Sequence, residues 1–260
     1  MTRLCRGIVL AALATAALAA PAPAQQEAPP PKPGGVPDRV RVVVNAAFWP
    51  SGPSYSDSRT FTEYAEQTTI RTSYEAGSGF GPDLAVQVSL YRGFGLLVAY
   101  SRTSRDVTAT VDVSRPHPLY LSRHRSASAD DSGYELAEGA VHLDLAFARA
   151  AGRLDWAVFA GATLFQVEAD LLSKPTYTDV YPYDELVIAS TPSTTVKESP
   201  TGFNVGGRLD YRFGSSRRFG AGVQVLYSTA SVRLKAVPEA TEATFDAGGL
   251  SVGAGVRVYF

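Results

Sequence analysis

The sequence predicts an all-β protein, an antiparallel up-and-down transmembrane β-barrel. Three observations predict this class. Apolar and polar residues alternate with a period of two over most of residues 39–260, and no stretch there approaches the roughly 18 consecutive apolar residues of a spanning helix. The segments that join the alternating runs are short and long in turn, as in outer membrane barrels. We expect eight strands, with ten as the alternative.

The first 24 residues are typical of a secretory signal peptide. Arg3 and Arg6 precede an apolar run over residues 7–20, and the small residues that follow predict cleavage after Ala24. A membrane anchor is less favoured, because the run is shorter than the ~20 apolar residues that span a bilayer. Cys5, the single cysteine, precedes the run, so the mature chain is expected to have no thiol, disulfide or cysteine metal site.

Residues 25–38 separate this segment from the predicted barrel domain, residues 39–260. They contain five prolines and no apolar period, which predicts an extended tether or a disordered N-terminus. The net charge of the whole chain is -1, so composition suggests no polyanionic partner.

Alternation defines the strands in order. The first begins at Arg39, and the stretch "RTFTEYAEQTTIRTSY" (59–74) predicts a hairpin that lengthens the first two strands; counted as separate membrane strands, it gives ten. The strand 94–113 changes phase near Ser101, and 154–172 carries Trp156 on the face that later shows Glu168, so either a bulge or an apolar patch inside is expected. The later strands are expected at about 82–92, 94–113, 133–149, 154–172, 199–213, 218–235 and 244–260.

The polar face favours a membrane barrel over a soluble one. In "TGFNVGGRLDYRF" (201–213), Phe203 and Leu209 share one face, whereas Arg208 and Asp210 share the other with small glycines. Small residues and charges of both signs suit a crowded barrel interior, where arginines must pair with carboxylates. A soluble lipocalin-like barrel is the alternative. Several strands exceed the 9 to 11 residues of a membrane strand, so their polar loop-side halves are expected to form an extracellular rim.

With this pattern and the terminal "VGAGVRVYF", the sequence resembles the OmpA-like or OmpX-like outer membrane β-barrel family of Gram-negative bacteria over roughly residues 39–260. The resemblance implies signal-directed export to the outer membrane and contact with outer membrane lipids and lipopolysaccharide. It also implies assembly by the barrel assembly machinery, with Val256, Val258 and Phe260 as the C-terminal signal. Nothing follows the barrel, so peptidoglycan binding through a C-terminal domain is not implied. We expect a monomer.

The interior of an eight-stranded barrel is just filled by side chains, which predicts a salt-bridged plug and no wide channel. His142 and Asp144 share the inward face with Glu138, so an acid–base site of a lipid-modifying enzyme is conceivable, but no serine stands in a recognisable motif. We therefore expect no catalytic residue, no cofactor, no metal and no enzymatic activity. The predicted interior charge network comprises Arg41, Glu138, His142, Asp144, Arg208, Asp210, Arg212 and Arg257.

Two loops are candidate contact surfaces. The cationic stretch "SRPHPLYLSRHRS" (114–126) could pair with lipopolysaccharide phosphates or an acidic partner, or be a solvated loop offset by Asp130 and Asp131. The stretch "TYTDVYPYDEL" (176–186) could contact a ligand or pack over the barrel mouth, and calcium binding by its acids lacks a loop signature. The candidate contact residues are Arg115, His117, Arg123, Arg125, Tyr177, Tyr181 and Tyr183.

These features predict a plugged outer membrane barrel with an extended extracellular rim and a structural or surface-interaction role. The alternatives are a small porin or transport channel and, less favoured, a barrel-embedded lipid-modifying enzyme. No motif identifies an extracellular ligand, and no nucleic-acid module is present.

Overall fold

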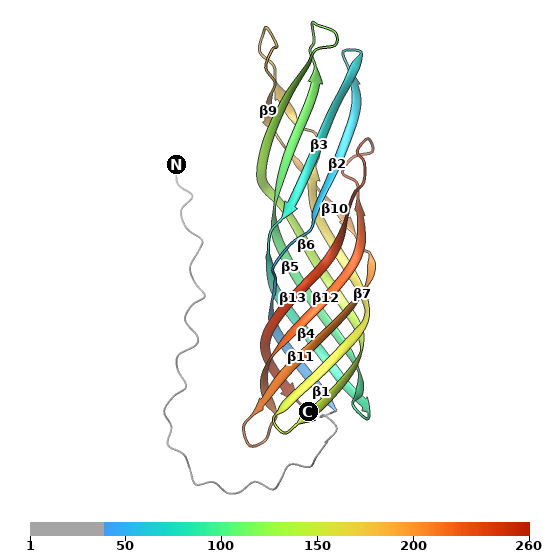
Figure 1. The fold of residues 1–260 in the computed structure, drawn as a ribbon, viewed down its shortest axis with the longest axis vertical. Helices are drawn as coiled ribbons and strands as arrows, with labels where there is room; N and C mark the ends of the chain where they lie inside the picture. The colour runs from blue at the N-terminus through green and yellow to red at the C-terminus, as the bar shows by residue number, and fades with distance from the viewer. Residues whose placement is uncertain (1–38) are drawn as a thin grey trace, which may run out of the picture. The chain divides into compact units, whose positions relative to one another are not determined.

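The computed structural model describes residues 39–260, shown in Figure 1. The predicted signal peptide, the tether and Cys5 lie outside the described residues. In residues 39–260 no helix is long and apolar enough to cross a membrane. The strands are β1 (Val40–Trp49), β2 (Ser54–Glu63), β3 (Glu66–Ala76), β4 (Gly79–Tyr91), β5 (Phe94–Pro116), β6 (His124–Ala151), β7 (Leu154–Leu172), β8 (Thr176–Thr178), β9 (Val187–Ser190), β10 (Ser193–Glu198), β11 (Thr201–Phe213), β12 (Phe219–Leu234) and β13 (Ala243–Tyr259).

Eight of these strands close into a ring. Antiparallel ladders join β1 to β4, then β5, β6, β7, β11, β12 and β13, and β13 pairs back with β1. At the closing seam, Val40 and Phe260 exchange both backbone hydrogen bonds, at 3.2 and 2.9 Å. A closed ring leaves no unpaired edge, as a barrel in lipid requires. The predicted eight-stranded antiparallel barrel is confirmed.

The remaining strands lengthen the ring on one side. β4 pairs with the first part of β5, and β3 pairs with its later part, from Val107 to Ser114, so β3 continues β4 along the same edge. β2 pairs with β3, and β10 continues β11 along β7. The hairpin predicted at 59–74 therefore lengthens the first two strands, and the ten-strand alternative is wrong. These extensions lie at the end of the barrel opposite the C-terminus (Figure 1).

Two predicted loops contain more strand than expected. The segment 114–132 is mostly strand, because β5 runs to Pro116 and β6 begins at His124, which leaves only 117–123 as the tip of the hairpin. A register shift in β6, opposite Val107 and Ala109, exchanges the inward and outward residues of this strand. The alternation is interrupted at that point, so the sequence does not show that the strand continues. The segment 173–198 contains the β8–β9 hairpin and β10.

The outer face changes from apolar to polar along the strands, but the backbone parity of β5 and β7 does not change. On β5, every odd-numbered residue from Gly95 to Val113 is buried inside the barrel. The outward residues are apolar as far as Tyr100 and polar from Arg102 onward. Of the two explanations offered for the phase change near Ser101, the apolar patch inside is correct. The same holds on β7, where Trp156 and Glu168 both point outward.

The barrel therefore has two parts. Its first part carries an exposed ring of large apolar side chains, the apolar belt, whose members are Val44, Phe48, Phe80, Leu84, Val86, Val88, Leu90, Phe94, Leu96, Val98, Tyr100, Val141, Leu143, Leu145, Leu154, Trp156, Val158, Leu164, Phe203, Val205, Leu209, Tyr211, Phe213, Phe219, Val223, Val225, Tyr227, Leu250, Val252, Val256 and Phe260. The second part, the rim, comprises residues 54–76, 102–138, 166–198 and 229–249, and its outward residues are mostly polar.

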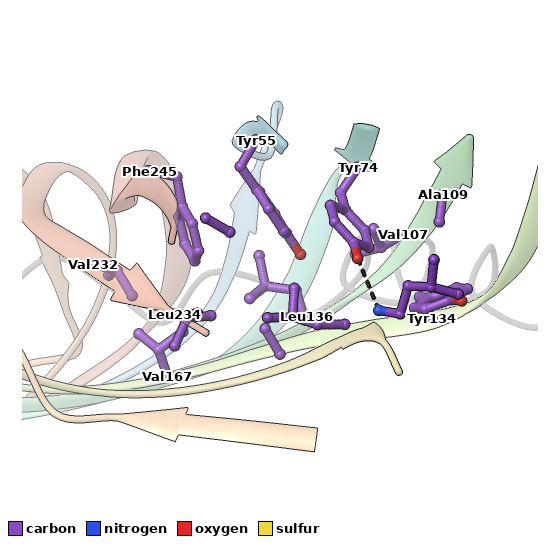
Figure 2. Close-up of a cluster of buried hydrophobic side chains, with 14 of the residues drawn as sticks. Tyr55, Tyr74, Val107, Ala109, Tyr134, Leu136, Val167, Val232, Leu234 and Phe245 are labelled. Carbon is purple, nitrogen blue, oxygen red and sulfur yellow. Dashed lines mark hydrogen bonds between the residues drawn. The ribbon is translucent and has the colours of Figure 1, made fainter. Parts of the chain in front are cut away.

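The interior of the rim is a packed apolar core. Tyr55 stacks between Tyr74 and Phe245, with ring centroids 4.8 and 4.6 Å apart, and Tyr134 packs edge-on against Tyr74 (Figure 2). Burial raises the pKa of Tyr74, whose hydroxyl donates to Asp57 and accepts from the amide of Leu172. This rim core consists of Tyr55, Ile70, Tyr74, Val107, Ala109, Val111, Val113, Tyr134, Leu136, Ala140, Phe165, Val167, Ala169, Leu171, Leu172, Leu186, Ala230, Val232, Leu234, Ala243, Phe245 and Ala247.

Candidate functional site: the charged interior and the capped mouth

A cluster of arginines and aspartates fills the barrel interior near the C-terminal end. Strand parity turns these side chains inward from β1, β7, β11 and β13. Arg41 contacts Asp155 at 3.0 Å and Asp210 at 3.1 Å, Arg257 contacts Asp210 at 2.7 Å, and Arg212 contacts Asp155 at 2.7 Å. All five side chains are buried. Each aspartate thus pairs with two arginines through short charge-assisted contacts, which is the geometry that makes buried charge tolerable.

Aromatic and amide groups extend this cluster. The Arg212 guanidinium lies 3.9 Å from the centroid of the Tyr259 ring, and that of Arg41 lies 4.8 Å from it, both within cation–π range. Arg257 also donates to Asn45, which in turn donates to Asp83 at 3.1 Å. The cluster is therefore continuous across the lumen from β11 to β4.

Arg208 is the least satisfied member of the cluster. Its nearest carboxylate oxygen belongs to Asp210, at 3.5 Å, and none of its three guanidinium nitrogens forms a hydrogen bond within residues 39–260.

Glycine provides the room for this packing. A Cβ at Gly222 would collide with the carboxylate of Asp210, and one at Gly161 would collide with that of Asp144. The small inward residues noted in the sequence therefore accommodate long charged side chains from neighbouring strands.

The two inward residues His142 and Asp144 belong to a second, separate group. His142 contacts Thr163 Oγ1 at 2.9 Å and Ser101 Oγ at 3.3 Å, and Asp144 accepts from Asn204 at 2.8 Å. Asn204 lies between them, so the carboxylate does not orient the imidazole as a serine hydrolase requires. All of these side chains are buried, so Ser101 faces no exposed surface.

Glu138 lies in a third layer, directly below the rim core. It pairs with Arg105 at 2.9 Å and accepts the amide of Gly248 at 3.1 Å. The predicted network is thus three layers: five of its members form the arginine–aspartate cluster, two form the His142 group, and one pairs with Arg105. Sequence reasoning missed Asp155, Asp83 and Arg105, although all three lie on the inward parity of their strands.

A network of ion pairs closes the mouth of the rim. Arg115 contacts Glu63 at 2.7 Å and Asp179 at 2.7 Å, and Arg125 contacts Asp179 at 2.7 Å. Tyr177 packs on the Arg115 guanidinium, 5.2 Å from the ring centroid. We call Glu63, Arg115, Arg125, Tyr177 and Asp179 the cap. Three distant segments of the chain meet in it, from β2, the β5–β6 hairpin and the loop after β8.

The cap corrects two expectations about the loops. Arg115 and Arg125 are buried and paired inside the mouth, so they are not surface contact residues. Asp130 and Asp131 do not offset them, because Asp130 accepts from Thr110 and Asp131 accepts from Thr191.

The cap arginines lower the pKa of both acids. Burial alone would raise the pKa of Glu63, but hydrogen bonds from Arg115 and Thr68 outweigh it and hold that pKa below its ordinary value. Burial would also raise the pKa of Asp179, but the hydrogen bonds and positive charges of Arg125 and Arg115 have the larger effect, so this pKa too is lowered. Both acids are therefore ionised at neutral pH, and the cap is fully paired there.

Beyond the cap, the loops expose apolar side chains to solvent. Asp184 joins the two loops through Arg123, at 2.7 Å, and His117, at 3.7 Å. His117 is buried and stacks on Tyr120, and Tyr183 packs edge-on against Tyr181. No group of three or more His, Cys, Asp or Glu side chains in residues 39–260 is placed to hold a metal ion. The exposed side chains, which we call the apex patch, are Leu119, Tyr120, Leu121, Val180 and Tyr181.

Comparison with known proteins supports the fold. No protein-family model and no curated protein sequence matches this chain. Among solved structures, it is similar to the outer membrane protein OprG from Pseudomonas aeruginosa, with a TM-score of 0.55 and 12% identity over 87% of this chain and 98% of OprG. Neisserial surface protein A (NspA) gives a TM-score of 0.44 and 11% identity over 85% of this chain and 97% of NspA. At this identity the likeness to OprG concerns the fold, which is that of an outer membrane β-barrel.

Proposed function

We propose that the protein is an outer membrane β-barrel with a closed interior, and that it acts as a structural or surface-contact protein rather than as a channel. The observation that carries this proposal is the closure of the lumen at successive levels. A solute would have to pass the arginine–aspartate cluster, the Arg105–Glu138 layer, the rim core and the cap. A small channel needs a continuous water path, and the apolar rim core in particular offers none.

The apolar belt together with the barrel fold supports the proposed outer membrane location. Large exposed apolar side chains surround the whole ring, which suits a lipid environment and not a soluble surface. At the C-terminus, Val256 and Phe260 point outward and are 56% and 69% exposed, while Val258 shares their parity. This supports the proposed role of these three residues as the assembly signal. Export by the signal peptide and a monomeric state complete the proposal.

The apex patch is the surface we propose for contact. Leu121, Val180 and Tyr181 are 78%, 71% and 76% exposed, at the end of the rim far from the belt. Arg115 and Arg125 are already paired with Asp179 in the cap, and Arg123 is paired with Asp184. Apolar and aromatic contact with a partner protein is therefore favoured over the pairing with phosphate that the sequence suggested.

Three experiments test this proposal. In planar bilayers the purified barrel is expected to produce no stable conductance steps, and reproducible steps would favour the channel alternative instead. In outer membrane fractions, unboiled protein is expected to migrate differently from boiled protein; a periplasmic location without this shift would contradict the membrane assignment. For the enzyme alternative, His142→Ala is expected to leave lipid A composition unchanged, because His142 is held in a closed group.

A further inference from the structure

The outer wall of the barrel has a distinctive row of residues where the belt meets the rim. On β5, β6 and β7, the last belt positions in register are Tyr100, Val141 and Leu164. One step toward the rim, the outward residues in register are Arg102, Gly139 and Gln166. We call these last three the boundary row. Its members are a cation, a residue without a side chain and an amide, placed directly above apolar side chains.

The missing side chain at Gly139 opens a groove in this wall. A Cβ built at Gly139 would meet Gln166 at 3.9 Å, an ordinary van der Waals distance, so a side chain could stand there without a collision. The break between β10 and β11 forms the far side, where Pro200 accepts a hydrogen bond from Phe165 at 2.9 Å. The groove has a volume of about 350 Å³ and is lined by Tyr100, Gly139, Ala140, Val141, Leu164, Phe165, Gln166, Ser199 and Pro200.

The charges around the groove favour an anionic head group. Arg102 is exposed beside Gly139, and no ion pair of Arg102 is found within residues 39–260. In the next row toward the rim, Lys197 is neutralised by Glu168 at 2.6 Å, and Ser104 donates to Glu135 of the row beyond. Arg102 is thus the free cation of this part of the wall, at the depth where head groups meet the aqueous phase.

These features fit one kind of ligand, an amphiphile with an acyl chain and a phosphate. The apolar lining continues into the belt, where an acyl chain would lie, and a guanidinium pairs well with phosphate. We propose that this groove binds one acyl chain of lipid A, with a lipid A phosphate on Arg102. This step rests on the proposed outer membrane location with the rim outside, because lipid A then forms the surrounding leaflet.

The test uses the folded barrel purified in detergent and stripped of lipid. Lipid A and phosphatidylglycerol are titrated separately, and bound lipid is counted by native mass spectrometry. Gly139→Leu fills the groove, and Arg102→Gln removes the cation. The matched controls are Ala254→Leu, a small outward belt residue on β13, and Arg233→Gln, an exposed rim arginine on β12. Heat-dependent gel mobility verifies that each variant is folded.

Wild type is expected to retain lipid A over phosphatidylglycerol. Arg102→Gln is expected to weaken lipid A binding about 10-fold, as the loss of a charge-assisted contact predicts. Gly139→Leu is expected to weaken it as well, because the leucine side chain occupies the space of the acyl chain, and each control is expected to bind as wild type does. Equal binding of phosphatidylglycerol, equal loss in the controls, or unchanged binding in folded Arg102→Gln would overturn the proposal. Failure of the outer membrane location is detected separately, by fractionation of cells, because this titration uses isolated barrel.

Discussion

Asp210 is the residue on which the interior cluster depends most. Its two carboxylate oxygens contact Arg41 and Arg257 at 3.1 and 2.7 Å, and it is also the nearest acid to Arg208. Removing one partner of a buried ion pair leaves the remaining charge without compensation, which costs more than the pair itself contributes.

Asp210→Asn is therefore expected to destabilise the barrel by about 3 to 5 kcal/mol, because the amide keeps the shape but not the charge. Urea unfolding in detergent, followed by gel mobility, measures the change. The control Asp246→Asn alters an exposed aspartate on β13 and is expected to stay within about 0.5 kcal/mol of wild type. Equal unfolding midpoints for the two variants would show that the cluster does not stabilise the fold.

The cap gives the mouth a pH dependence of known sign. The pKa values of Glu63 and Asp179 are lowered in the folded state, so their pairing contributes stability above the ordinary values of 4.5 and 3.8. That contribution is lost as the pH falls through the lower folded values. Amide exchange of residues 114–126, corrected for the intrinsic rate, is expected to stay slow at neutral pH and to rise below about pH 4.

Glu63→Gln serves as the control for the cap, because it removes one of the two titrating acids. In this variant, exchange over residues 114–126 is expected to be faster already at neutral pH and to depend less on acid. Identical corrected exchange at pH 7 and pH 3 in wild type would rule out the cap as a closure of the mouth.

At the scale of elements, β13 is the strand that completes the ring. It pairs with β1 on one side and β12 on the other, and Phe260 contributes backbone hydrogen bonds to Val40. Replacing the Phe260 side chain leaves these backbone bonds possible. A defect confined to assembly can therefore be separated from one in stability.

Phe260→Ser is expected to lower the amount of folded barrel in the outer membrane, while the fraction that folds keeps its unfolding midpoint. The reason is that the exposed terminal aromatic is proposed as a signal and not as packing. Phe213→Ser, at another exposed belt aromatic, is the matched control and is expected to assemble normally. A similar loss in both variants would point to general loss of belt hydrophobicity instead.

Period two made the elements predictable, because it states which residues share a face. The inward positions of Arg208 and Asp210, the hairpin at 59–74 and the seam between the first and last strands all follow from it. Period two does not state whether the outward face of a strand meets lipid or water. On β5 the parity is constant while the outside turns polar beyond Tyr100, and the sequence shows this only as an apparent phase change.

The cap and the layering of the interior were beyond sequence reasoning for another reason. Arg115 meets Glu63 and Asp179, which lie 52 and 64 positions away in the chain, and the loop after β8 that holds Asp179 carries no alternation to fix its path. Asp144 and His142 are two residues apart on one face, yet Asn204 from β11 separates them. Such contacts depend on how strands stagger around the ring, which pattern alone does not specify.

For the whole molecule, the central feature is the inversion of the barrel halfway along its strands. In the belt, apolar side chains face outward and charged ones fill the lumen. In the rim, polar side chains face outward and an apolar core fills the lumen. The strands thus keep their parity where the belt meets the rim, since the register shift of β6 lies farther along, within the rim. The rim core makes the second half a closed, water-exposed barrel.

The most direct measurement of this inversion is the accessibility of spin labels along the outer face of β5, in barrel reconstituted into bilayers. Cys5 is the single native cysteine, so single cysteines can be introduced into residues 39–260 without competition there. Labels in place of Leu96, Val98 and Tyr100 are expected to be accessible to oxygen, and labels in place of Arg102, Ser104 and Asp106 to a water-soluble nickel chelate. Accessibility to nickel at all six positions would contradict the account, because the barrel would then lie in water along its whole length.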